Sequence, residues 1–194
     1  MARESTAIDS RGRRHKLRPM RAMLGAAASI LIACGLALAD EGADFGVAPT
    51  RALRLADYAA PTPRELPVGR TIRTPQLRAW LERDAPLRPL LFDVVGGTGH
   101  DSIPGAIWLP GAGRGASFED PVQAQLARTL ETLTGRDRTR SMVFFCAGAE
   151  CWLSYNAALR AAALGYREVY WYRGGIEAWI DAGGPLSPAE GPSW

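Results

Sequence analysis

Residues Ser141–Trp152 read SMVFFCAGAECW, and this stretch decides both the fold and the candidate chemistry. The apolar run Met142–Phe145 predicts a buried strand that ends at Cys146. Four small or acidic residues separate Cys146 from Cys151, and a helical pattern follows over Leu153–Leu164. A cysteine between a strand and a helix N-terminus lies where backbone N–H groups and the helix dipole stabilise an anion. Such a position favours the thiolate, so the stretch predicts sulfur chemistry at Cys146, with Cys151 as its candidate partner.

The segments around this stretch alternate between strand-like and helix-like patterns. Leu90–Val95 is a nearly continuous apolar run, typical of a strand buried on both faces, whereas Pro121–Leu133 has apolar residues at helical spacing. Further strands are predicted at Ala106–Leu109 and Glu168–Tyr172, and further helices at Gln76–Arg83 and Ile176–Ala182. Alternation of this kind predicts an α/β fold built on a mainly parallel sheet.

Residues 1–39 are typical of an export signal. A basic segment precedes the uncharged apolar run Ala22–Ala39, which ends in an A-x-A cleavage pattern. An uncleaved membrane anchor is the alternative, since the run is long enough for one. The sequence Leu31–Cys34 also resembles a bacterial lipobox, which would make Cys34 the acylated first residue. In each case we expect the domain to work outside the cytoplasm, with membrane contact only through the signal region or a lipid at Cys34.

The charge balance without residues 1–39 excludes several function classes. These residues hold 7 of the 23 Lys and Arg residues and 2 of the 20 Asp and Glu residues, so 16 basic and 18 acidic residues remain, a net charge of −2. The remaining basic residues are dispersed, which excludes a nucleic-acid-binding surface. His100 is the one histidine left, which excludes a multi-histidine metal site. No motif for PQQ, haem or a metal is evident, so no cofactor is predicted.

The rest of the chain, about 155 residues, is enough for one domain with one core. Residues 40–73 are rich in Pro, Ala and Arg, and we expect them to form an irregular N-terminal strap that wraps the domain. This segment is called the strap below. Thr74-Pro75 is typical of the start of a helix, so the folded domain is placed at residues 74–194.

Four motifs follow one another in this domain. They are a strand that ends at Asp93, the sequence IPGA at Ile103–Ala106, a strand that leads into Cys146 with its loop and helix, and RGGIEAW at Arg173–Trp179. In this order they resemble the rhodanese-like domain, over Thr74–Pro185. The resemblance implies a rhodanese-like fold, with helices on both faces of the sheet, and the activity of a rhodanese-type sulfurtransferase.

The resemblance also implies roles for the residues around the cysteine. In such enzymes the cysteine at the strand exit, by position Cys146, takes a sulfane sulfur from a small sulfur-containing anion and holds it as a persulfide. It then passes the sulfur to an acceptor such as a protein thiol. The loop after the cysteine binds the anion through its N–H groups, for which small residues are suited. Here the loop residues are Ala147, Gly148, Ala149 and Glu150, and Trp152 is expected in the core and the wall of the site.

A narrower resemblance concerns four stretches of the same domain. They are IPGAIWLPGAG (103–113), Cys151-Trp152, SYNAALRAAALGY (154–166) and VYWY (169–172). They resemble the CxxCW-motif proteins associated with PQQ-dependent alcohol catabolism. This resemblance implies a periplasmic accessory role beside a quinoprotein dehydrogenase and no known reaction.

Two further residues are candidates for supporting roles. Asp93 could orient the active loop, or it could simply cap the turn after its strand. Arg173 could attract anions such as thiosulfate, or it could pair with Glu177 on the following helix. His100, in a Gly-rich loop, is either a base near the site or a surface residue.

Two features of the cysteine loop are not expected for a simple sulfurtransferase. Glu150 places a carboxylate beside the thiol, and a carboxylate raises a thiol pKa. Four residues separate Cys146 from Cys151, whereas two residues separate the cysteines of the CxxCW motif. A Cys146–Cys151 disulfide is therefore an alternative, and its closure would require the loop to fold back.

Three functions stay open on the sequence alone. The first is sulfur transfer through a Cys146 persulfide. The second is thiol–disulfide chemistry between Cys146 and Cys151. The third is a non-catalytic binding module that assists a quinoprotein dehydrogenase.

Overall fold

The computed structural model describes residues 6–8, 14–16 and 40–194. The chain divides into two compact units, and in the first, Met1–Gly35, the short strands β1 (Thr6–Ile8) and β2 (Arg14–Lys16) pair antiparallel. The apolar run of the predicted signal, its cleavage site and the candidate lipid site Cys34 lie outside the described residues. Within the described part of the chain, none of the helices combines the length and apolar character needed to cross a membrane.

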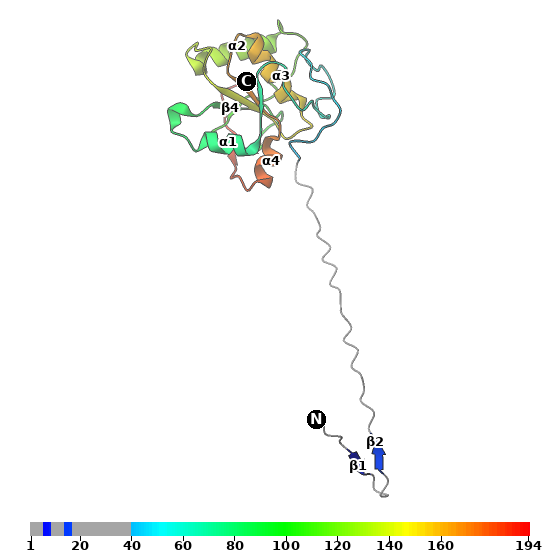
Figure 1. The fold of residues 1–194 in the computed structure, drawn as a ribbon. Helices are drawn as coiled ribbons and strands as arrows, with labels where there is room; N and C mark the ends of the chain where they lie inside the picture. The colour runs from blue at the N-terminus through cyan, green and yellow to red at the C-terminus, as the bar shows by residue number, and fades with distance from the viewer. Residues whose placement is uncertain (1–5, 9–13, 17–39) are drawn as a thin grey trace. The chain divides into compact units, whose positions relative to one another are not determined.

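The second unit is built on a five-stranded parallel sheet with the strand order β3-β8-β7-β4-β6 (Figure 1). The strands are β3 (Arg70–Ile72), β4 (Leu90–Asp93), β6 (Ile107–Trp108), β7 (Met142–Phe145) and β8 (Val169–Tyr172). All four residues of the central strand β7 are buried, which explains its continuous apolar sequence. The mainly parallel α/β fold expected from the sequence is confirmed.

Helices cover both faces of this sheet. They are α1 (Thr74–Leu81), α2 (Pro121–Thr134), α3 (Trp152–Ala163) and α4 (Gly175–Asp181), with a 3₁₀ turn η1 at Ala85–Leu87. Phe144 of β7 packs in the cluster with α2 and α3, and its neighbours Val143 and Phe145 pack in the cluster with α1 and α4. This is the alternation of side chains that a strand imposes. Figure 1 shows the two helix pairs on opposite sides of the strands.

Three short strands were not indicated by the sequence. β5 (Asp101–Ser102) and β9 (Ser187–Pro188) pair antiparallel and join the loop after β4 to the C-terminal segment. Segments of two residues are too short to carry a period-2 pattern. The third, β3, is part of the strap, so the segment expected to be irregular also provides an edge strand of the sheet.

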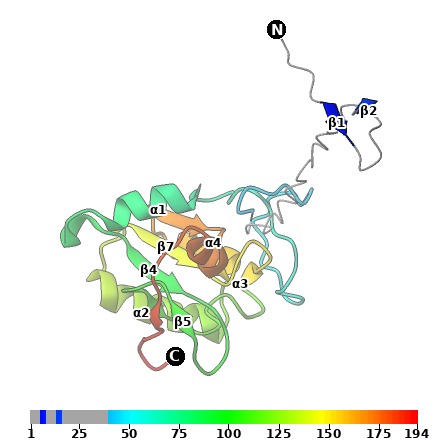
Figure 2. The ribbon, with the colours of Figure 1, turned by 90° about the horizontal axis from the view of Figure 1, so that it is seen from below.

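Most of the strap runs alongside α3, in blue to cyan in Figures 1 and 2. The buried Tyr155 hydroxyl accepts from the Thr50 N–H at 2.9 Å and donates to the Thr50 carbonyl at 2.8 Å. The Asn156 side chain likewise accepts from the Arg54 N–H at 3.0 Å and donates to its carbonyl at 2.7 Å. A buried polar group without such partners costs about 1–3 kcal/mol, so α3 requires the strap.

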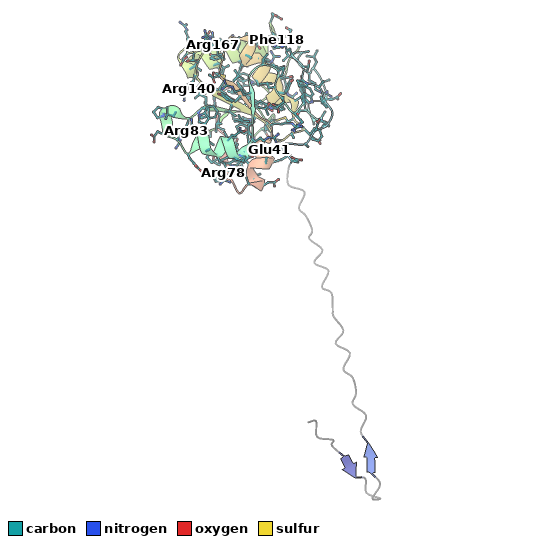
Figure 3. The ribbon with its side chains drawn as sticks, viewed as in Figure 1. Glu41, Arg78, Arg83, Phe118, Arg140 and Arg167 are labelled. Carbon is teal, nitrogen blue, oxygen red and sulfur yellow. A yellow bond between two sulfur atoms is a disulfide. The ribbon has the colours of Figure 1, made fainter. Side chains whose placement is uncertain are left out.

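The beginning of the strap caps α1. Glu41, labelled in Figure 3, accepts hydrogen bonds from the N–H and the hydroxyl of Thr74, both at 3.0 Å. A carboxylate at this end of a helix is favoured by the helix dipole. The Thr74 hydroxyl also lies 2.6 Å from the hydroxyl of Tyr172, so these side chains join the strap, α1 and β8.

Candidate active site

The cysteine loop, residues 146–151, leaves the carboxyl end of the central strand β7. Here Phe145 lies in register with Asp93 of β4 and Tyr172 of β8. The carboxyl ends of adjacent parallel strands are the usual place for a ligand crevice in an open α/β sheet. The strand-to-helix position inferred for Cys146 from the sequence is the position that it occupies.

Cys146 and Cys151 are joined by a disulfide, with their Cα atoms 6.1 Å apart. The loop folds back through a turn in which the Cys151 N–H donates to the Gly148 carbonyl at 3.2 Å. Cys146 is buried, with 3% of its surface exposed, whereas Cys151 is partly exposed. Of the alternatives that the sequence left open for this pair, the structure holds the disulfide.

The carbonyl groups of the cysteine loop are held by two other segments. At the start of α4, the N–H of Ile176 donates to Cys146 at 3.0 Å and that of Glu177 donates to Ala147 at 2.8 Å. On the strap, the Thr62 hydroxyl donates to the Ala149 carbonyl at 2.6 Å. These bonds fix the loop from both sides.

The N–H groups of the loop are in a different situation from its carbonyls. Among the described residues, none accepts a hydrogen bond from the N–H groups of residues 147–150. These are the groups expected to bind an anion. The first N–H of α3, by contrast, is already used: Trp152 N–H donates to the Tyr58 carbonyl of the strap at 2.8 Å.

A cavity of about 570 Å³ opens beside the disulfide and includes both cysteines in its wall. Its charged lining residues are Arg114, Glu150 and Glu177. The Arg114 guanidinium lies over the ring of Tyr58, 5.8 Å from the ring centre. Arg114 was not predicted as a site residue, because a single arginine carries no sequence pattern. Its one signal was its position directly after the LPGAG motif.

Arg114 is positioned by a fully buried arginine in α3. Arg160 donates to the Arg114 carbonyl at 2.7 Å and to the Asp120 carboxylate at 2.9 and 3.1 Å. Burial alone would raise the pKa of Asp120, but the hydrogen bonds from Arg160 and from the N–H groups of Gln123, Ser117 and Ala116 hold it well below its usual range. The segment that carries Arg114 is therefore fixed by a buried ion pair.

Trp152 takes part in packing and in anchoring the strap. Its side chain is buried, its indole N–H donates to the Pro61 carbonyl at 3.0 Å, and its ring contacts Tyr155 edge to face. It belongs to the core, as expected. It is not among the residues that line the cavity, so the expected role in the site wall is not realised.

Asp93 holds the loop that follows β4. Its fully buried carboxylate accepts hydrogen bonds from the Val95 N–H at 2.9 Å, the His100 Nε2 at 2.7 Å and the Ser102 hydroxyl at 2.5 Å. Val95 and its neighbour Gly96 line the cavity. Asp93 thus caps the turn and shapes one wall of the site, while His100 faces Asp93 and is not among the cavity-lining residues.

Arg173 has neither of the two roles predicted for it from the sequence, which were attracting anions and pairing with Glu177. Its guanidinium is 1% exposed and donates to the carbonyls of Glu41, Ala43 and Thr62 and to the Thr62 hydroxyl, at 2.8–3.1 Å. It therefore lies outside the cavity and does not pair with Glu177. Burial, followed by the charge of Arg73, lowers the pKa of Arg173. The role of Arg173 is to anchor the strap.

Metal ligands are not gathered in the described part of the chain. Among those residues there is no group of three or more His, Cys, Asp or Glu side chains that could hold a metal ion. The chemistry available at the cavity is that of the cysteine pair, one guanidinium, two carboxylates and the loop N–H groups.

Comparison with known proteins gives one family and several similar structures. The model of the rhodanese-like domain family matches residues 75–182. Similar solved structures include a rhodanese-like domain from Anabaena (22% identity, TM-score 0.43, covering 60% of this chain and 77% of that one). A Lactobacillus plantarum protein is 23% identical, with a TM-score of 0.44, covering 60% of this chain and 87% of that one.

A third similar structure is a thiosulfate sulfurtransferase from Pseudomonas aeruginosa, with 23% identity, a TM-score of 0.44 and 65% of this chain covered. The match spans only 21% of that enzyme's length. A comparison with curated proteins found no match.

Proposed function

Because this chain belongs to the rhodanese-like domain family, we propose that it transfers sulfane sulfur through a persulfide on Cys146. The observation that carries the proposal is the position of Cys146 at the carboxyl end of β7. There it borders a cavity of about 570 Å³, next to loop N–H groups that have no acceptor among the described residues. Such N–H groups bind an anionic donor or a persulfide anion.

The proposed transfer takes two steps. The Cys146 thiolate attacks the outer sulfur of a donor such as thiosulfate, a bond forms from Sγ to that sulfur, and the donor's S–S bond breaks so that sulfite leaves with the electron pair. A thiolate acceptor then attacks the terminal sulfur, and Cys146 leaves as a thiolate. Arg114 would offset the negative charge of the donor in the cavity.

The disulfide defines a resting state that cannot carry sulfur. While Sγ of Cys146 is bonded to Cys151, Cys146 has no thiolate that can attack a sulfur donor. A reducing thiol must therefore reduce the disulfide first. This observation favours thiol–disulfide exchange as a second candidate function. In that case the pair would exchange electrons with another protein, and both cysteines would be equally essential.

The proposed setting is the periplasm, where the chain would arrive through its N-terminal signal or remain tethered by a lipid on Cys34. The signal-like pattern of residues 1–39 supports export, and a disulfide suits an oxidising compartment. The resemblance to the CxxCW-motif proteins supports an accessory role beside a quinoprotein dehydrogenase in PQQ-dependent alcohol catabolism. The partners would then be a small sulfur-containing anion, a protein thiol and that dehydrogenase system.

The test uses the Cys151→Ser variant, in which Cys146 is free of its partner. The variant is incubated without oxygen with thiosulfate, and its intact mass is measured before and after alkylation. We expect the mass of one added sulfur atom on Cys146 and release of sulfite. Cys146→Ser is the matched control and should gain none. A folded Cys151→Ser protein whose free thiol takes up no sulfur would contradict the proposal.

A further inference from the structure

A persulfide on Cys146 would form within reach of a second thiol. The disulfide establishes that the Sγ atoms of Cys146 and Cys151 come to bonding distance with the loop in its observed conformation. On the basis of the persulfide chemistry proposed above, we infer that Cys151 is a resolving cysteine. It turns the bound sulfane sulfur into hydrosulfide, so the protein is a thiol-dependent sulfane-sulfur reductase as well as a sulfur acceptor.

The reaction balances without a further oxidant. The Cys151 thiolate attacks Sγ of the Cys146 persulfide, a bond forms between the two Sγ atoms, and the bond to the terminal sulfur breaks so that HS⁻ leaves with the electron pair. The product is the disulfide that the structure contains. A dithiol reductant then reduces this disulfide and becomes a disulfide itself. The two electrons that convert sulfane sulfur to sulfide thus come from that dithiol.

The position of Cys151 favours this internal attack over transfer to an outside acceptor. Its backbone forms a bridge with Ala59 of the strap, and the next N–H, that of Trp152, is bonded to the Tyr58 carbonyl. On the other side, α4 holds the carbonyls of Cys146 and Ala147. The two cysteines are therefore held facing each other, and pre-positioning of this kind replaces a bimolecular encounter.

The burial of Cys146 also favours attack by Cys151 over attack by an outside thiol. Cys146 is 3% exposed, so a protein thiol would have poor access to a sulfur bound there, whereas the Cys151 side chain is already adjacent. The cavity of about 570 Å³ touches both cysteines and gives the departing HS⁻ a path, with Arg114 as a cation in its lining. Small anions can therefore enter and leave through this cavity.

The experiment is a single turnover on the reduced wild-type protein. The full chain is reduced, freed of reductant without oxygen, and mixed with thiosulfate. Sulfide is trapped with a bimane reagent, and free thiols are counted by alkylation and intact mass. We expect about one sulfide per chain and loss of the thiols of Cys146 and Cys151, two of the three cysteines in the full chain. In Cys151→Ser, sulfide should fall by about tenfold or more while sulfur accumulates on Cys146.

The outcomes separate this inference from the proposal on which it rests. Wild-type protein that keeps a sulfur on Cys146 beside a free Cys151 thiol overturns the resolving role and leaves sulfur loading intact. Sulfur found on Cys151 also overturns it, because the attack then falls on the terminal sulfur. Failure of Cys151→Ser to load sulfur overturns the persulfide chemistry itself. If Cys151→Ser does not fold, the wild-type measurement still tests the resolving role by itself. Thr132→Ala, on the exposed side of α2, is the control variant and should behave as wild type.

Discussion

Arg173 at the end of β8 donates hydrogen bonds to both the hydroxyl and the carbonyl oxygens of Thr62, 111 residues earlier in the chain. Thr62 in turn donates from its hydroxyl to the Ala149 carbonyl in the cysteine loop. One buried guanidinium is therefore linked to the candidate site through a single strap residue. The strap is a structural part of that site.

Replacing Arg173 by Ala should loosen the strap and destabilise the domain. The change removes donors to the carbonyls of Glu41 and Ala43, which are partly buried, and to the buried Thr62. We expect a loss of about 3 kcal/mol in the free energy of unfolding, measured by urea denaturation with the disulfide intact. Arg64→Ala is the control, since Arg64 is exposed and its contact with Asp44 is long at 3.8 Å. A loss no larger than that of the control would show that the strap does not depend on Arg173.

Reducing thiols should attack the disulfide at Cys151. This side chain is partly exposed, whereas Cys146 is buried, and access decides which sulfur is attacked. Oxidised protein is mixed briefly with glutathione, trapped by alkylation, and digested with trypsin and a glutamate-specific protease. Cleavage after Glu150 separates the two cysteines. The mixed disulfide is expected on the peptide 151–160, and its recovery on 141–150 would reverse the assignment.

Asp120→Asn should cost stability in a pH-dependent way. The pKa of Asp120 is lowered in the folded protein, so its contribution is present above the unfolded pKa near 4 and is lost as the pH falls below that value. We expect the variant to be about 3 kcal/mol less stable near neutral pH, because the charge of the buried Arg160 loses its partner. The gap between the two proteins should narrow in urea titrations below about pH 4.

The control for this pH dependence is Glu119→Gln. Glu119 is the exposed neighbour of Asp120, and its carboxylate has no ion pair among the described residues. Its variant should follow the wild-type curve at every pH. A gap between Asp120→Asn and wild type that stayed constant into acid would assign the effect to packing and not to charge.

Two glycines around the cysteine loop should respond differently to alanine. Gly175 has a φ of 60°, and a Cβ there would collide with the carbonyls of Cys146 and Ala147. The three atoms nearest to a Cβ on Gly148 all belong to the carboxylate of Glu177, an exposed side chain that can move. Gly175→Ala should lower the free energy of unfolding by about 2 kcal/mol or more, and Gly148→Ala by less than about 1 kcal/mol. Equal losses in thermal unfolding would contradict this account.

Much of the fold was accessible from the sequence because it depends on local patterns. The apolar run Met142–Phe145 identified the central strand, and the strand-to-helix position of Cys146 followed from it. The roles of Arg173 and Arg114 were not accessible, since their partners lie on distant segments that no periodicity connects. The disulfide stayed undecided for a related reason: it depends on contacts of the loop with α4 and the strap, which are set by the tertiary fold.

The edge position of β3 has a consequence for the boundaries of the domain. The family match begins at residue 75, after this strand, although β3 is the outer neighbour of β8. A protein cut at that boundary would present Val169–Tyr172, an aromatic and β-forming segment, as a free edge with unpaired backbone groups. Such edges recruit strands from other molecules and lead to aggregation. The strap therefore also protects the sheet against self-association, and shorter versions of the protein should keep the chain from residue 40 onward.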